Sequence, residues 1–131
     1  MIISKELEKL GEIYKKEENR IWMKIPKKDL LKIMEELKHG FGVRRVSSIS
    51  GYDNGKEIEV IYHLEFGHEL LNLKALVSKK SNAIDSITGI FPSANLFERE
   101  LAEMLGIKIK GHPNLKKLFL PEEINHPLRK D

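Results

Sequence analysis

Two carboxylates and an arginine stand side by side near the end of the chain, as Glu98-Arg99-Glu100. Paired carboxylates can serve as acid and base in hydrolysis, but neighbouring positions on a helix point in different directions, so these two do not face one substrate. A carboxylate beside an apolar stripe is partly buried and is stabilised by an arginine. The triplet therefore indicates charge pairing or a solvated helix face more than catalysis.

Histidines are the other candidates for chemistry. His112 and His126 each precede a proline, which favours extended backbone, and neither has a second metal ligand at the usual spacing. We therefore favour a structural or interface role for both over a metal site. His63 lies among glutamates on the polar side of a predicted strand, where exposure to solvent is expected. The sequence has no cysteine, which excludes disulfides, a thiolate nucleophile and cysteine-bound iron–sulfur or zinc sites.

Composition indicates one ordinary globular domain. The 131 residues carry a formal net charge of +3, with acidic and basic side chains interleaved, so a nucleic-acid-binding stripe is not favoured. No apolar run approaches the roughly 18 residues that span a bilayer. The first residues lack the layout of a secretion signal, so we expect a cytosolic protein. Glutamine is absent while Lys, Glu and Ile are abundant, a bias typical of thermophiles.

Helical periodicity appears in the first 40 residues. Ser4 can cap a first helix whose apolar face consists of Leu7, Leu10 and Tyr14, closed by the charged run 15–20. Pro26 precedes a second helix that ends near Gly40. The apolar stripe of this second helix consists of Leu30, Ile33, Met34 and Leu37.

Alternating apolar and polar residues predict four strands, at 20–25, 43–50, 58–66 and 70–78, with a hairpin turn at Asp53-Asn54-Gly55. Residues 81–92 are expected to form a loop. These elements predict an α+β fold: a two-layer domain in which helices pack on a mixed, mostly antiparallel sheet, with an extended C-terminal arm. We divide the single domain 1–131 into a core (1–92), a charged helix (93–105) and a docking arm (106–131).

The charged helix carries the acidic triplet. Asn95 and Glu98 have the spacing of a capping box at its start. At 3.6 residues per turn, Arg99 and Glu103 are expected on the polar side, while Glu98 and Glu100 flank the apolar stripe. That stripe is expected to consist of Phe97, Leu101, Met104 and Leu105.

With these motifs the sequence resembles a known family, the 30 kDa subunit of respiratory-chain NADH dehydrogenase (NADH:quinone oxidoreductase) and its relatives in membrane-bound hydrogenases. The resemblance is specific because many segments keep the family's spacing from residue 56 onward. The segments are 60–64, 86–88, 91–95, 98–100, 103–107, 111–117, 120–121 and 126–131.

The resemblance implies a subunit without a cofactor and without chemistry of its own, which acts only as part of an oxidoreductase complex. Its partners would be a large subunit, quinone-reductase-like or nickel–iron-hydrogenase-like, and a small iron–sulfur subunit. Iron–sulfur clusters would lie in those partners, joined by a nickel–iron centre in a complex of the hydrogenase type. The complex would hold this protein peripherally on the cytoplasmic side of the membrane.

The resemblance also implies which residues dock the partners. Arginines would pair with partner carboxylates and glutamates with partner arginines, while the prolines would pre-set an extended arm. The expected docking residues are Glu98, Arg99, Glu100, Glu103, His112, Lys116, His126, Pro127, Leu128, Arg129 and Lys130.

Some features depart from the respiratory members. The sequence stops at Asp131 without a further tail. Leu96 and Phe97 replace a tryptophan-containing pair that is common there, and Met104 stands where an aromatic residue is frequent. Shortness favours the compact version found in archaeal energy-converting hydrogenase or formate hydrogenlyase-type complexes, whose electron donor would be ferredoxin or formate instead of NADH. Two alternatives stay open: a small basic nucleic-acid-binding domain and a stand-alone metal-dependent hydrolase.

Overall fold

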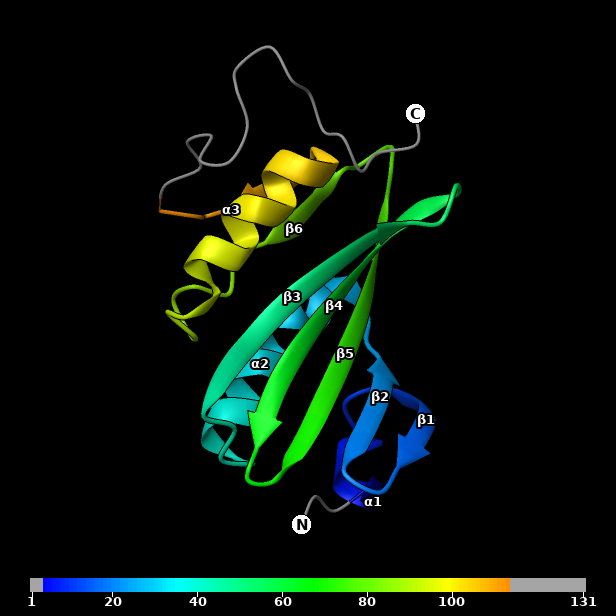
Figure 1. Cartoon of the computed structure of the whole chain (residues 1–131), viewed down its shortest axis with the longest axis vertical. Coiled ribbons are helices and arrows are strands. Elements are labelled where there is room, and N and C mark those ends of the chain that lie inside the picture. Colours follow the sequence, from blue (N-terminus) through cyan, green and yellow to red (C-terminus); the bar gives the residue numbers. More distant parts are fainter. Residues whose placement is uncertain (1–3, 114–131) are drawn as a thin grey trace.

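The protein is built on one twisted sheet, seen in a computed structural model that describes residues 4–113 (Figure 1). The sheet has five strands in the order β1-β2-β5-β4-β3. The pair β2–β5 is parallel and the other pairs are antiparallel. The elements are α1 Ser4–Leu7, β1 Glu12–Glu17, β2 Arg20–Lys24, a 3-10 turn Lys27–Asp29, α2 Leu30–His39, β3 Arg45–Asp53, β4 Glu57–Phe66, β5 Glu69–Ser78, β6 Ala83–Asp85, α3 Ala94–Leu105 and β7 Lys108–Lys110.

This architecture confirms the predicted α+β fold with a mixed, mostly antiparallel sheet. The predicted strands appear as β2, β3, β4 and β5, and the second predicted helix as the 3-10 turn with α2. The turn at Asn54 joins β3 to β4, and Gly55 there has a φ of 93° that only glycine adopts readily.

The first predicted helix is wrong. Only Ser4–Leu7 is helical, and Glu12–Glu17 forms β1, which makes a hairpin with β2. Gly11 allows the backbone before β1 to approach β2, because a Cβ there would lie 2.4 Å from the carbonyl oxygen of Lys24. One charged side chain of β1 contacts β2: the ammonium of Lys15 lies 4.5 Å from the ring centroid of Trp22.

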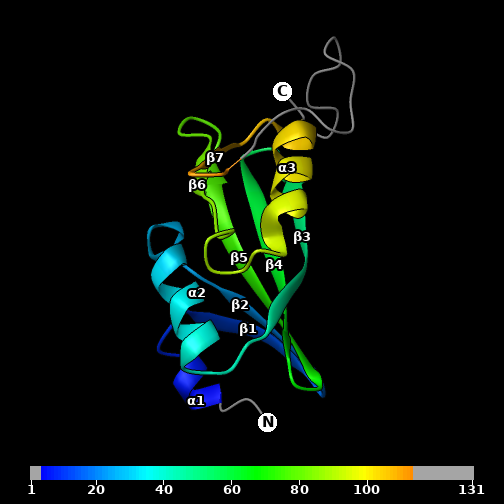
Figure 2. The same cartoon turned by 90° about the vertical axis from the view of Figure 1, so that its left-hand side faces the viewer.

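The connection after β5 also differs from the prediction. Residues 83–85, expected within a loop, form β6, which pairs in parallel with β7. The segment expected as the docking arm, 106–131, contains β7 near its start, and from residue 114 onward it lies outside the described residues. Figure 2 shows α3 with β6 and β7 at one end of the sheet and α2 at the other.

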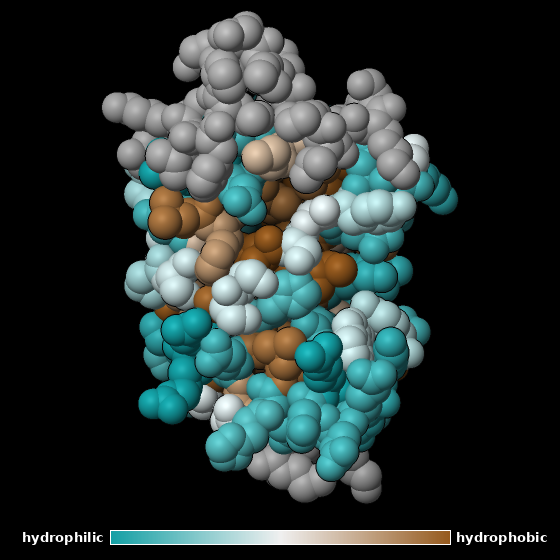
Figure 3. All heavy atoms as spheres, viewed as in Figure 1, coloured by the Kyte–Doolittle hydropathy of each residue, from teal (hydrophilic) through white to brown (hydrophobic). Residues whose placement is uncertain are grey.

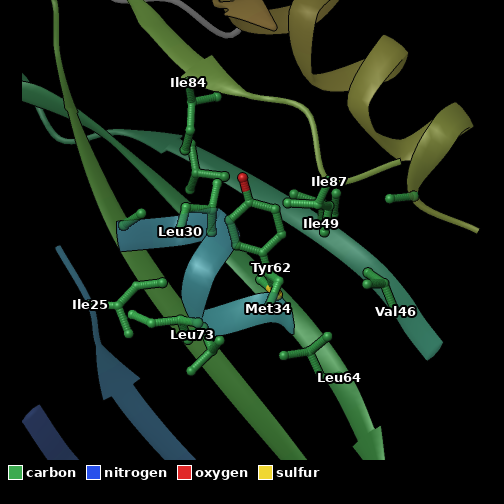
Figure 4. Close-up of a cluster of buried hydrophobic side chains, with 14 of the residues drawn as sticks. Ile25, Leu30, Met34, Val46, Ile49, Tyr62, Leu64, Leu73, Ile84 and Ile87 are labelled. Carbon is green, nitrogen blue, oxygen red and sulfur yellow. The ribbon is translucent and has the colours of Figure 1, made fainter. Parts of the chain in front are cut away.

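The main core lies between the sheet and α2. The predicted stripe of α2 is buried as expected, together with the inward residues of β2, β4 and β5. Figure 4 shows this cluster around Tyr62, which is 1% exposed. Burial of each large apolar side chain here contributes roughly 1.5–3 kcal/mol, which is why the alternating pattern determines which side of each strand faces inward.

The opposite face of the sheet faces the viewer in Figure 3, with apolar side chains along its middle and polar ones around them. His63 lies on this face, and it is only half-buried. Its Nδ1 lies 2.6 Å from Oδ1 of buried Asn72, and its Nε2 lies 2.8 Å from the hydroxyl of Ser50. His63 is thus held in a network across β3, β4 and β5, and is not simply solvated as expected.

Candidate functional site

The carboxylate of Glu98 is buried and accepts several hydrogen bonds from one loop. Glu98 is 1% exposed, and three donors surround it. The hydroxyls of Ser86 and Thr88 donate to Oε1 at 2.7 and 2.8 Å, and the backbone N–H of Ile87 donates to Oε2 at 2.8 Å. We call Glu98 with residues 86–88 the Glu98 clamp.

The backbone around the clamp explains why the three donors converge. β6 ends at Asp85, and the N–H of Ser86 then donates to the carbonyl of Lys110 at the end of β7. A turn follows, in which the N–H groups of Ile90 and Phe91 both donate to the carbonyl of Ile87. This turn points residues 86–88 at Glu98 in the N-terminal half of α3, so the clamp ties β6, β7 and α3 together.

His112 extends the clamp from the other side. Its side chain is fully buried, and Nε2 lies 3.0 Å from the backbone carbonyl oxygen of Asn95. Because a carbonyl only accepts, Nε2 carries the proton and donates it to this bond. The same nitrogen lies 3.9 Å from Oε1 of Glu98. The histidine of the first His-Pro pair therefore makes a structural contact to α3.

Tyr62 lies close to the clamp from the side of the core. Figure 4 shows its hydroxyl pointing out of the apolar cluster, toward the end that carries β6. Burial raises the pKa of Tyr62 well above 10.0, and the negative charges of Glu98 and Asp85 raise it further. The phenol therefore stays neutral at any physiological pH.

The raised pKa of Tyr62 predicts a loss of stability in alkaline solution. The folded state holds the proton more tightly than the unfolded state, so the contribution is fully present below pH 10.0 and is lost as the pH rises toward the folded pKa. We expect the free energy of unfolding in urea to fall more between about pH 8 and about pH 11 for the unchanged protein than for Tyr62→Phe. Equal slopes would contradict the prediction, and the exposed Tyr52→Phe is the matched control.

The buried side of α3 differs from the predicted one. Its buried face is centred on Ala94, Glu98, Leu101 and Leu105, and not on Phe97 and Met104, which are half-buried. Glu98 therefore points into the fold and does not flank the stripe. It also makes no capping box with Asn95, because its oxygens are taken by the loop and the N-cap residue is Ser93.

The other expected docking residues fall into three groups. Glu100 is exposed on α3. Glu103, expected on the polar side, is only 5% exposed, and Arg99 is half-buried; both are engaged in interactions. Lys116 and the run His126, Pro127, Leu128, Arg129 and Lys130 lie outside the described residues.

Sequence reasoning missed the clamp itself. Ser86 and Thr88 stand out in the sequence only through the family resemblance, and nothing in their spacing indicates that they surround Glu98. One signal could have revealed the clamp. Glu98 lies on the same side of the helix as the apolar residues Ala94, Leu101 and Leu105, and a carboxylate buried there requires hydrogen-bond donors.

Apolar side chains also lie on the outer side of α3. Leu96 is 55% exposed, and Phe97 and Met104 are half-buried beside the exposed Glu100. We call Leu96, Phe97, Glu100 and Met104 the outer face of α3. Across residues 4–113, no group of three or more His, Asp or Glu side chains is placed to hold a metal ion. In the same range, no helix has the length and apolar character to cross a membrane.

The sequence is similar to known proteins over most of its length. A model of the family "Respiratory-chain NADH dehydrogenase, 30 Kd subunit" matches residues 23–131. A subunit of the NADH-quinone oxidoreductase of Moorella thermoacetica is 34% identical over 112 residues, which cover 82% of this sequence and 76% of that protein. A subunit of the F(420)H(2) dehydrogenase of Methanosarcina mazei is 36% identical over 118 residues, covering 86% and 75%.

A solved structure agrees in fold. One polypeptide in the structure of the membrane-bound sulfane sulfur reductase, an archaeal respiratory membrane complex, superposes with a TM-score of 0.81 at 18% identity, covering 95% of this protein and 78% of that one. The family match extends over more than three-quarters of the sequence and includes both the clamp and the outer face of α3. This protein therefore belongs to the family of the 30 kDa subunit of respiratory-chain NADH dehydrogenase, found in NADH-quinone oxidoreductase-type and related membrane complexes.

Proposed function

We propose that this protein is a cofactor-free, non-catalytic docking subunit in the cytoplasmic arm of a membrane-bound redox complex. It joins a large quinone-reductase-like or nickel–iron-hydrogenase-like subunit to a small iron–sulfur subunit, and the metal centres belong to those partners. The protein then reaches the membrane only through the complex. The two relatives described above support this role, because each is named as one subunit of a dehydrogenase or oxidoreductase.

The observation that carries the proposal is the combination of a fixed helix and an apolar outer face. The Glu98 clamp and His112 hold α3 from the inside through four hydrogen bonds. The same helix carries the exposed Leu96 and the half-buried Phe97 and Met104 beside the exposed Glu100. Apolar groups grouped at a surface mark an interaction site, and a pre-ordered surface binds at a lower cost in entropy.

The roles of the docking residues follow from their burial. Glu100 is exposed and so is placed to receive an arginine or lysine of a partner. Arg129 lies outside the described residues, and its proposed role rests on its chemistry, since a guanidinium can pair with a carboxylate through two hydrogen bonds. Glu98 and His112 act indirectly, since they hold α3 and do not touch a partner themselves. Removing the inner residues should therefore change stability first, while removing the outer ones should change assembly alone.

This division predicts the effect of shortening the protein. Removal of residues 126–131, and separately Arg99→Ala, should leave the isolated domain folded but weaken its recovery with the other subunits. The reason is that residues 126–131 carry charged groups that the sequence places outside the core. Arg99 is half-buried on α3, but its loss removes no apolar side chain from the core. Affinity purification from solubilised membranes, with circular dichroism of the isolated protein, measures the two effects. Normal assembly and activity in both variants would refute the docking role.

Native purification tests the proposed function itself. The tagged protein should be isolated from detergent-solubilised membranes, its co-purifying proteins identified, and bound nickel and iron assayed. Recovery with a large subunit, nickel and hydrogen evolution would support the hydrogenase-type complex. Iron without nickel, with NADH or F420H2 oxidation, would support the respiratory type. A protein recovered alone would overturn the proposal.

A further inference from the structure

The outer edge of β3 is open to another strand. β3 runs over nine residues, Arg45–Asp53, at the end of the sheet order, and within residues 4–113 no strand pairs with its outer side. At its start the hydroxyl of Ser93 donates to the carbonyl of Val46 at 3.1 Å, which closes that position. Farther along, residues 49–51 have no partner strand on this outer side within residues 4–113, and an edge of this kind can recruit an extended segment.

A groove runs between this edge and α3, which lie side by side in Figure 2. Its volume is about 230 Å³, and residues 49–51 of β3 form one wall. The other wall comes from α3: Glu100, Leu101, Met104 and Leu105. Gly51 sets the spacing of the walls, since a Cβ there would meet methyl groups of Leu101 and Leu105 at 2.4 and 2.3 Å. A free sheet edge beside a helix is the arrangement that binds peptides by strand addition.

The charge of the groove indicates what it binds. Glu100 is exposed at its wall and forms no ion pair within the described part of the protein. Met104 next to it is apolar and half-buried. A carboxylate here repels an acidic segment or a free C-terminus and attracts a cation, while Met104 adapts to an apolar neighbour.

We propose that the groove binds an extended segment of a neighbouring subunit, which adds a strand to the edge of β3. The segment carries an arginine or lysine that pairs with Glu100, next to an apolar side chain that packs on Met104. Backbone hydrogen bonds supply affinity and the two side chains select the sequence. The inference rests on the proposed docking function and adds the surface and the chemistry of the partner segment.

The absence of cysteine from all 131 positions allows a direct test. Met104→Cys, labelled with a maleimide–benzophenone reagent on the isolated protein before it is reassembled with the other subunits, places a photocrosslinker in the groove and leaves Glu100 unchanged. Glu36→Cys is the control, because Glu36 is exposed on α2 at the other end of the sheet. We expect position 104 to crosslink to a single segment of another subunit, containing Arg or Lys, and position 36 to give no such product.

A charge reversal then tests the pairing. Glu100→Lys in the Met104→Cys background should abolish the crosslink, while Glu36→Lys should leave it unchanged, because only the first places like charges together. A crosslink that survives Glu100→Lys, a product with a second copy of this protein, or no product above the control would overturn the groove inference while the complex stays intact. A protein that co-purifies with no partner would instead overturn the proposed function, and this inference with it.

Discussion

Replacing Glu98 by alanine should lower the free energy of unfolding by about 3 kcal/mol, the largest effect we expect from one polar side chain in this protein. The change removes the acceptor of three hydrogen bonds at 2.7–2.8 Å and leaves the N–H of Ile87 buried without a partner. The hydroxyls of Ser86 and Thr88 can rotate to other acceptors, so the backbone donor accounts for much of the loss. Urea unfolding followed by circular dichroism measures it.

Two variants make this prediction specific to the clamp. Glu98→Gln keeps the shape and one acceptor oxygen, so we expect a smaller loss of about 1–2 kcal/mol. Glu100→Ala changes an exposed glutamate two positions along the same helix, and its effect should stay within about 0.5 kcal/mol. If Glu98→Ala and Glu100→Ala were equally stable, the clamp would not be what fixes α3.

Gly51→Val should destabilise the protein by about 1–3 kcal/mol, because it forces apart α3 and β3. The first added atom alone would lie 2.3 Å from Leu105 and 2.4 Å from Leu101, both of them buried. Valine suits a strand better than glycine, so any loss reflects the collision and not the backbone preference. Thermal or urea unfolding gives the magnitude.

Gly89 is the matched control for Gly51. A Cβ at Gly89 has no neighbour within 4 Å, so Gly89→Ala should be neutral within about 0.5 kcal/mol. A double-mutant cycle of Gly51→Ala with Leu105→Ala should show favourable coupling, because the truncated leucine makes room for the new methyl group. Additive effects would mean that α3 adjusts to the added atom without touching Leu105.

The elements that could be predicted are those whose burial repeats along the sequence. In β4 the buried residues Ile58, Val60, Tyr62 and Leu64 alternate with Glu59, Ile61 and His63, which matches the two sides of the strand. In α2 the stripe of Leu30, Ile33, Met34 and Leu37 matches one side of a helix. Both patterns indicate which side of the strand or helix faces the core, and they can be seen in a few neighbouring residues of the sequence.

The missed elements depend on contacts between distant parts of the sequence. β1 carries four charged side chains in six residues and is exposed over nearly all its length, so it has no apolar alternation to reveal it. It is a strand because β2 lies beside it. β6 and β7 have three residues each and form only by pairing with one another, although α3 separates them in the sequence.

The candidate site was predicted in part for the same reason. The sequence pointed to the triplet at residues 98–100, but it could not separate the roles of the two glutamates. That separation depends on the rotation of α3 about its axis, which Gly51 and the loop at 86–88 determine from two other parts of the sequence. One glutamate became the internal anchor, and the other remained at the surface.

The parallel pairing of β2 with β5 has a consequence for the order in which the protein folds during synthesis. The hairpin β1–β2 leaves the ribosome first, yet Arg20 finds its neighbour only when Leu70 has emerged. The meander β3–β4–β5 consists of hairpins between adjacent strands and can form as soon as it is made. The N-terminal hairpin and α2 therefore wait with apolar surface exposed, a stage at which a chaperone is expected to bind the nascent polypeptide.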